Sequence, residues 1–226
     1  MASSSLPGTV ARAPAGLGFD TSTVVTEATA HALREQGYRF CARYLHRSAQ
    51  VDPTPQGGAL SVSEAQTILA AGLGLIPVQY GDATLAPSAA SGAQVGAAAA
   101  SNAAGLGFPP GVTVWCDVEW KAEAAPKDSA GTIAYVNAWA DAVAAAGYRA
   151  GLYVGPNIPL SSTELYRSLP GIRHYWKAAS AVPWVETRGF QLVQSLSLTS
   201  AGLYLDADVA CYDGLGDRFY LLMPSG

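Results

Sequence analysis

The chain has 226 residues, of which 50% are hydrophobic and 13% are charged, and its formal net charge is -4. A chain so apolar and so sparing of charge is not intrinsically disordered, and the lack of a basic run argues against nucleic acid as a partner. No apolar stretch reaches the length of about 18 residues that a membrane helix needs, so we expect no membrane insertion. The length suits a single α/β barrel.

Residues 1–15 are rich in Ser, Pro and Ala and lack the basic and then apolar pattern of a secretory signal peptide. We therefore expect a flexible segment over 1–15 and one barrel domain over 16–226. The cellular location stays open. The protein is cytoplasmic, is exported by a non-standard route, or has lost a signal peptide by trimming of the chain. Three cysteines are too few for a disulfide framework, and no CxxC or HxxxH spacing is present, so we expect no metal and no cofactor.

A repeated pattern runs along the chain: a helix-like, often Ala-rich stretch, a glycine, and then a short apolar run. The glycines are Gly37, Gly72, Gly105 and Gly147, which lie 33 to 42 residues apart. Glycine suits the left-handed position just after a helix, and short runs rich in Val, Ile, Leu and Tyr are typical of buried parallel strands. The repeat therefore predicts consecutive βα units.

The predicted elements in chain order begin with a strand at 17–20. Helices at 26–36, 61–71, 88–104, 128–146 and 162–169 then alternate with strands at 39–45, 75–79, 113–119 and 149–154, and strands at 172–178, 190–194 and 203–209 follow. This order predicts an α/β fold, a TIM-like barrel of the (β/α)5 type followed by three strands with few helices. An open doubly wound sheet is the alternative, which the lack of GxGxxG after a strand disfavours.

Carboxylates gather at the predicted strand ends. The strand-end acids are Asp20, Asp117, Glu119, Asp206 and Asp208. Residues i and i+2 of a strand share a face, so Asp117 and Glu119 point to the same side of their strand, as do Asp206 and Asp208. Because active sites of βα barrels lie at the carboxyl ends of the strands, these acids meet at one mouth, where mutual repulsion leaves at least one protonated. A protonated acid beside an ionised one is the chemistry of a glycosidase.

Aromatic and polar side chains accompany these acids. Aromatic rings suit sugar faces, and we assign substrate binding to Tyr44, Tyr80, Tyr153, Trp176, Gln194 and Asp208. Each has a simpler interpretation, since rim aromatics often only pack and a strand-end Asp such as Asp20 often caps the next helix. The pair Asp117 and Glu119 is harder to dismiss, because two carboxylates in the apolar run TVWCDVEW are costly without a function. Arg43 is a candidate buried counter-charge for the acids.

Five segments, GLGFDTS, ARYL, WCDVEW, GLYVG and YLDADV, occur in this order between residues 16 and 212. Together they resemble the family 25 glycoside hydrolases, lysozymes that cut the muramic acid to glucosamine bond of peptidoglycan. The resemblance is closer to a related bacterial group, the glycoside-hydrolase-like domain of unknown function 1906. It implies a barrel of five β/α units plus three strands and a peptidoglycan-type glycan as the partner.

Position by position, the resemblance implies Glu119 as the general acid. Asp20, Asp117 and Asp206 match the family's other acids, and Asp117 or Asp206 would stabilise a substrate N-acetyl group that acts as nucleophile. Two positions depart from the lysozyme pattern: Gln79-Tyr80-Gly81 stands where a Tyr-His-aromatic run is usual, and Asp208 replaces a common Asn.

The predicted function is therefore hydrolysis of β-1,4-linked amino sugars by a monomer. A catalytically inactive barrel that binds glycan or serves as a structural module is the main alternative. An effector delivered by other machinery is a further one. A metal-dependent hydrolase is disfavoured because no histidine joins the acids.

Overall fold

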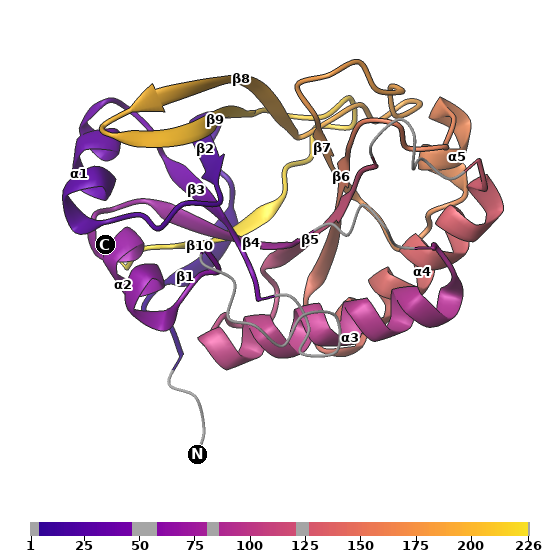
Figure 1. Cartoon of the computed structure of the whole chain (residues 1–226), viewed down its shortest axis with the longest axis horizontal. Helices are drawn as coiled ribbons and strands as arrows, with labels where there is room; N and C mark the ends of the chain where they lie inside the picture. The colour runs from indigo at the N-terminus through magenta and orange to yellow at the C-terminus, as the bar shows by residue number, and fades with distance from the viewer. Residues whose placement is uncertain (1–4, 47–57, 81–85, 121–126, 226) are drawn as a thin grey trace.

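The structure is a computed structural model that describes residues 5–46, 58–80, 86–120 and 127–225. Within these residues eight strands close into a barrel in the order β2-β3-β4-β5-β6-β7-β8-β9, and β9 returns to β2 (Figure 1). The strands are β2 (Gly16–Thr21), β3 (Phe40–Tyr44), β4 (Gly74–Gln79), β5 (Thr113–Val118), β6 (Arg149–Val154), β7 (His174–Lys177), β8 (Leu192–Ser200) and β9 (Leu203–Ala210). The predicted TIM-like barrel is confirmed.

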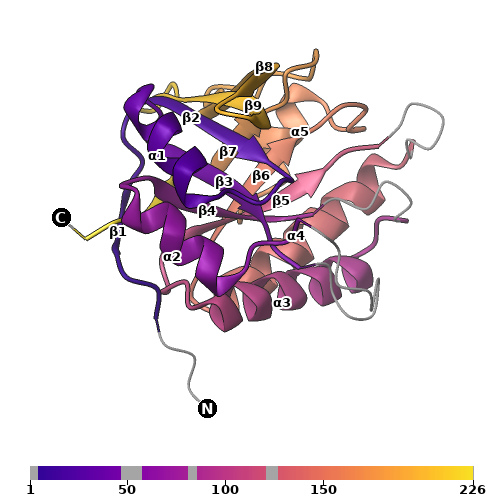
Figure 2. The same cartoon turned by 60° about the vertical axis from the view of Figure 1, so that its left-hand side comes forward.

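Helices follow the first five barrel strands, as the repeat predicts. They are α1 (Glu27–Glu35), α2 (Val62–Ala70), α3 (Ala89–Leu106), α4 (Ser129–Ala145) and α5 (Ser162–Arg167). Each begins after a Thr, Ser or Asp whose side chain accepts a hydrogen bond from the first turn. The helices α3 and α4 lie side by side below the barrel strands (Figure 2). No described helix is long and apolar enough to cross a lipid bilayer.

The last barrel strand differs from the parallel strands that the repeat predicts. β8 is parallel to β7, whereas β9 is antiparallel to both β8 and β2. β8 also continues six residues beyond the predicted end at 194. Residues 195–200 are mostly exposed and polar, because this half of the β8–β9 hairpin extends past the barrel wall, and so they carry no buried-strand pattern.

Residues 5–15, for which flexibility was expected, include a paired strand. β1 (Thr9–Arg12) pairs antiparallel with β10 (Tyr220–Met223), and β10 in turn pairs with β4. Leu6 is buried, and its backbone N–H donates to the carbonyl of Gly107. The expectation failed because the pairing partner lies more than 200 residues away, at a strand that sequence analysis also missed.

Aromatic side chains fill the barrel interior and so decide where a pocket remains. Trp115 lies at the centre, with its ring centroid 5.7 Å from that of Trp176 and 5.4 Å from that of Phe219. Phe40 contacts Phe219 edge to face at 6.0 Å. These buried rings fill the middle of the barrel, and a pocket remains at the carboxyl ends of the parallel strands.

Candidate active site

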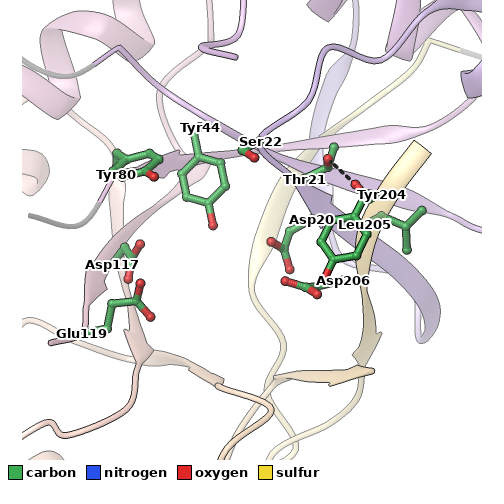
Figure 3. A pocket seen from close by; sticks show the side chains of 10 residues that line it. All are labelled: Asp20, Thr21, Ser22, Tyr44, Tyr80, Asp117, Glu119, Tyr204, Leu205 and Asp206. Carbon is green, nitrogen blue, oxygen red and sulfur yellow. Dashed lines mark hydrogen bonds between the residues drawn. The ribbon is translucent and has the colours of Figure 1, made fainter. Parts of the chain in front are cut away.

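A pocket of about 150 Å³ opens at the carboxyl ends of the parallel strands (Figure 3). Among the described residues it is lined by Asp20, Thr21, Ser22, Tyr44, Tyr80, Asp117, Glu119, Tyr204, Leu205 and Asp206. All four residues predicted as catalytic are therefore brought together from β2, β5 with the residue after it, and β9.

The four carboxylates form two pairs on opposite sides of the pocket. Asp20 lies directly across from Asp206 in the antiparallel β2–β9 ladder. Asp117 and Glu119 share one face of β5 and its extension, as the i, i+2 spacing predicts. Figure 3 shows the first pair on one side of the opening and the second pair on the other. A substrate in the pocket would have a carboxylate pair on each side.

Burial and mutual repulsion change the proton affinity of these acids. Burial is the main cause that raises the pKa of Asp20 to about 7, opposed by a hydrogen bond from Gln194 and assisted by the negative charge of Asp206. The pKa of Glu119 is also raised, first by burial and then by the charge of Asp206. Both sides of the pocket thus carry a carboxyl that holds its proton to a higher pH than usual.

Gln194 holds the pair of Asp20 and Asp206 in place by hydrogen bonds. Its Nε2 donates to Oδ2 of Asp20 at 2.9 Å and to Oδ2 of Asp206 at 3.3 Å. Its Oε1 accepts from the Tyr153 hydroxyl at 3.0 Å and from the backbone N–H of Ala179 at 3.3 Å. Two donors at Oε1 fix the orientation of the amide, so that Nε2 faces the carboxylates. Tyr153 and Gln194 support the acids instead of lining the pocket.

Asp208 and Trp176 also lie beneath the pocket surface. Asp208 is fully buried, and its Oδ1 accepts a hydrogen bond from Trp176 Nε1 at 2.9 Å. Burial, together with the charge of Asp20, raises the pKa of Asp208 well above its usual range. The structure therefore places these two side chains, both predicted as substrate-binding, in the barrel interior and away from the pocket lining.

Tyr44 and Tyr80, by contrast, line the pocket as predicted, and their ring centroids are 5.0 Å apart. Sequence analysis missed Tyr204, whose side chain is 64% exposed at the rim. It also missed Thr21, whose hydroxyl donates to the Tyr204 carbonyl at 2.8 Å and ties β2 to β9. The available signal was Tyr204 itself, two residues before Asp206 and hence on the same face of the strand.

Glu119 is held by the segment after β6. The backbone N–H of Trp120 donates to the carbonyl of Pro156 at 3.2 Å, and Asn157 Nδ2 donates to the Trp120 carbonyl at 2.7 Å. Gly155 packs so closely that a Cβ there would lie 2.5 Å from Cβ of Glu119. The segment 156–160 therefore fixes Glu119 without lining the pocket.

Arg43 has a different partner from the one considered for it. Its Nε donates to Glu64 Oε1 at 2.7 Å, and both side chains are buried. Its Nη1 donates to the Thr21 carbonyl at 2.6 Å, while Glu64 Oε1 also accepts from the backbone N–H of Val25 at 2.8 Å. The ion pair thus fixes the loop that follows Asp20. Among the described residues, no cluster of His, Cys, Asp or Glu has an arrangement that could hold a metal ion.

Residues 31–199 match the sequence model of one protein family, described as the Rv2525c-like, glycoside hydrolase-like domain. The chain belongs to this family. A curated relative, the uncharacterized protein YbfG of Bacillus subtilis strain 168, is 35% identical over 106 residues. That match covers 46% of this chain, and the chain spans only 14% of the length of YbfG.

Solved structures share the fold of this Rv2525c-like domain. An uncharacterized protein from B. stearothermophilus superposes with a TM-score of 0.65 at 20% identity, over 86% of this chain and 95% of its own. The Tat-secreted protein Rv2525c of Mycobacterium tuberculosis, crystallised with L-tartrate, has a TM-score of 0.60 at 17% identity, over 90% of this chain and 99% of its own. A family 25 glycosyl hydrolase from Bacillus anthracis has a TM-score of 0.57 at 13% identity, over 86% of this chain and 88% of its own. The superposition with the B. anthracis enzyme shows a barrel fold in common with the family 25 glycosyl hydrolases.

Proposed function

We propose that this Rv2525c-like domain is a glycoside hydrolase that cleaves β-1,4 linkages between amino sugars, with peptidoglycan as its substrate. The observation that supports this most is the presence of two carboxylate pairs on opposite sides of one pocket. In one of these pairs the pKa of Glu119 is raised, so this carboxyl keeps its proton to a higher pH than usual. The family membership and the fold shared with family 25 glycosyl hydrolases support the reaction class.

In the proposed reaction Glu119 donates its proton to the glycosidic oxygen as the bond to the anomeric carbon breaks. The substrate N-acetyl oxygen attacks the anomeric carbon, and Asp117 or Asp206 stabilises the positive charge that develops on that group. Water then opens the cyclic intermediate, and its proton returns to Glu119. Asp20, whose pKa is about 7, is only partly ionised at neutral pH and so limits the negative charge on its side of the pocket.

Aromatic residues at the rim fit a sugar chain. Tyr44, Tyr80 and Tyr204 line the opening, and Tyr80 and Tyr204 expose 38% and 64% of their surface. An amphipathic ring of this kind can stack on the apolar face of a pyranose while its hydroxyl binds a sugar hydroxyl. The exposed position suits a long polymer that crosses the mouth of the barrel.

Digestion of purified peptidoglycan with measurement of new reducing ends tests the proposal. Glu119→Gln should lose at least about 100-fold in rate, because a general acid contributes about 10²–10⁴-fold. The matched control is Glu35→Gln, an exposed carboxylate on α1 that does not line the pocket and should retain full activity. If no protein releases reducing ends but all bind glycan, the domain is the inactive glycan-binding module instead.

A further inference from the structure

A second cavity, of about 410 Å³, lies at the opposite end of the barrel from the carboxylates. Arg149 and His174, which begin β6 and β7, line it, and Arg12 and Tyr220 contribute from the β1–β10 pair. Because the parallel strands start here and end at the acidic mouth, the two sites are separated by the filled barrel interior. Nothing in the proposed hydrolysis uses this cavity.

Positive charge is concentrated around this cavity. Among its described lining residues are three arginines, Arg12, Arg149 and Arg173, and one carboxylate, Asp217. The whole chain has only 13 Lys and Arg residues and a net charge of -4, so three cations at one cavity run against its overall charge. Asp217 lies 3.7 Å from Arg12 and 3.9 Å from Arg188, and it compensates at most one charge. About two positive charges therefore remain in the lining.

Tyr220 holds two of the arginines in position. The guanidinium carbon of Arg149 lies 4.0 Å from the centroid of the Tyr220 ring, and that of Arg12 lies 5.8 Å from it. Arg12 Nε donates to the Tyr220 hydroxyl at 3.0 Å, and Arg149 Nε donates to the carbonyl of Gly111 at 3.1 Å. These contacts use Nε and the ring faces. Arg12 Nη2 lies 3.7 Å from Asp217 Oδ1, whereas the terminal N–H groups of Arg149 are left for an oxyanion.

His174 adds a neutral donor to the lining. The buried Thr113 hydroxyl oxygen accepts from the backbone N–H of Tyr220 at 3.0 Å and lies 3.1 Å from His174 Nδ1. When Thr113 donates its hydrogen to Nδ1, the ring carries its own hydrogen on Nε2. Burial is the main cause that lowers the pKa of His174 to about 4, opposed by the charge of Asp217 and assisted by the charges of Arg149 and Arg173, so the ring is neutral at physiological pH.

We propose that this arginine-lined cavity binds the phosphate group of a small phosphomonoester. A phosphomonoester carries nearly two negative charges at neutral pH, which match the two uncompensated arginine charges, whereas a phosphodiester or a single carboxylate carries one. The volume exceeds that of the phosphate alone, and the tyrosine and histidine rings leave room and contacts for a polar organic group such as a sugar.

Calorimetric titration with glucose 6-phosphate in 0.15 M salt tests the assignment. We expect saturable binding by this probe and none by glucose. Dimethyl phosphate, a monoanionic diester, should bind at least about tenfold more weakly, because loss of one charged contact costs about a factor of ten or more. Equal affinity for the diester, or no saturable binding of glucose 6-phosphate, overturns the proposal.

Variants locate the binding at this cavity. Arg173→Gln and Arg149→Gln should each weaken glucose 6-phosphate binding by about tenfold or more. Arg39→Gln, an exposed arginine outside the lining, should leave it unchanged. Arg173 is the safer variant because Arg149 stacks on Tyr220, and a thermal melt shows whether each variant folds. Unchanged affinity in the folded Arg173 variant contradicts the proposal, whatever the outcome of the peptidoglycan assay.

Discussion

Replacement of Asp20 by Asn should stabilise the folded protein at pH 8 and change its stability little at pH 4. Asp20 is 3% exposed, and its surroundings raise its pKa to about 7 from an ordinary value of 3.8. Between these two values the folded state binds a proton that the unfolded state has released. Stability contributed by this group is therefore present below pH 4 and is lost as the pH rises toward 7.

The size of the effect follows from the two pKa values. At about 1.4 kcal/mol for each pKa unit, the gap between 3.8 and about 7 corresponds to about 4 kcal/mol of lost stability at pH 8. Because the pKa of the neighbouring buried Asp208 is also raised, partly by the charge of Asp20, the two acids share this cost, and we expect Asp20→Asn to recover about 2–4 kcal/mol. The Asn side-chain oxygen still accepts from Gln194, so the hydrogen-bond network at the pocket persists.

Urea unfolding at pH 4 and pH 8, extrapolated to water, measures this difference. Asp141→Asn, an exposed carboxylate on α4, is the control and should change stability by less than about 0.5 kcal/mol at either pH. An equal change at the two pH values, or a loss of stability at pH 8, would refute the argument that ionised Asp20 is held in the pocket at a cost.

Three further outcomes follow from the packing. Glu64→Gln leaves the buried Arg43 guanidinium without a counter-charge and should lower the free energy of unfolding by about 3–5 kcal/mol in chemical denaturation. Gly96→Val should lower the melting temperature at a cost of about 1–3 kcal/mol, since even a Cβ there would lie 2.6 Å from the Trp139 carbonyl and push α3 from α4. Ellman's reagent should label Cys211 in the native protein and all three thiols only after unfolding, because the other two are fully buried.

Local signals made most of the barrel predictable from sequence. The apolar runs, the glycines after helices and the capping residues act over a few positions, and they located five βα units close to their observed bounds. Pairing between distant segments left no such trace. The four-residue strands at Thr9–Arg12 and Tyr220–Met223 bury few side chains. The partner that fixes Arg43 is Glu64, a residue of the helix predicted at 61–71 that no local pattern connects to Arg43.

Asp206 lies at the pocket as expected, although the expectation assumed the wrong strand direction. In a parallel strand, Asp206 and Asp208 would face the mouth because they lie near the carboxyl end. In the antiparallel β9 the order is reversed, and the amino-terminal half of the strand is the half nearest the mouth. Asp206 opposite Asp20 therefore lines the pocket, whereas Asp208 opposite Gly18 lies one step deeper and becomes a buried acid. The same reversal brings Tyr204, earlier in the strand, to the exposed rim, so strand direction determines which polar side chains can meet a substrate.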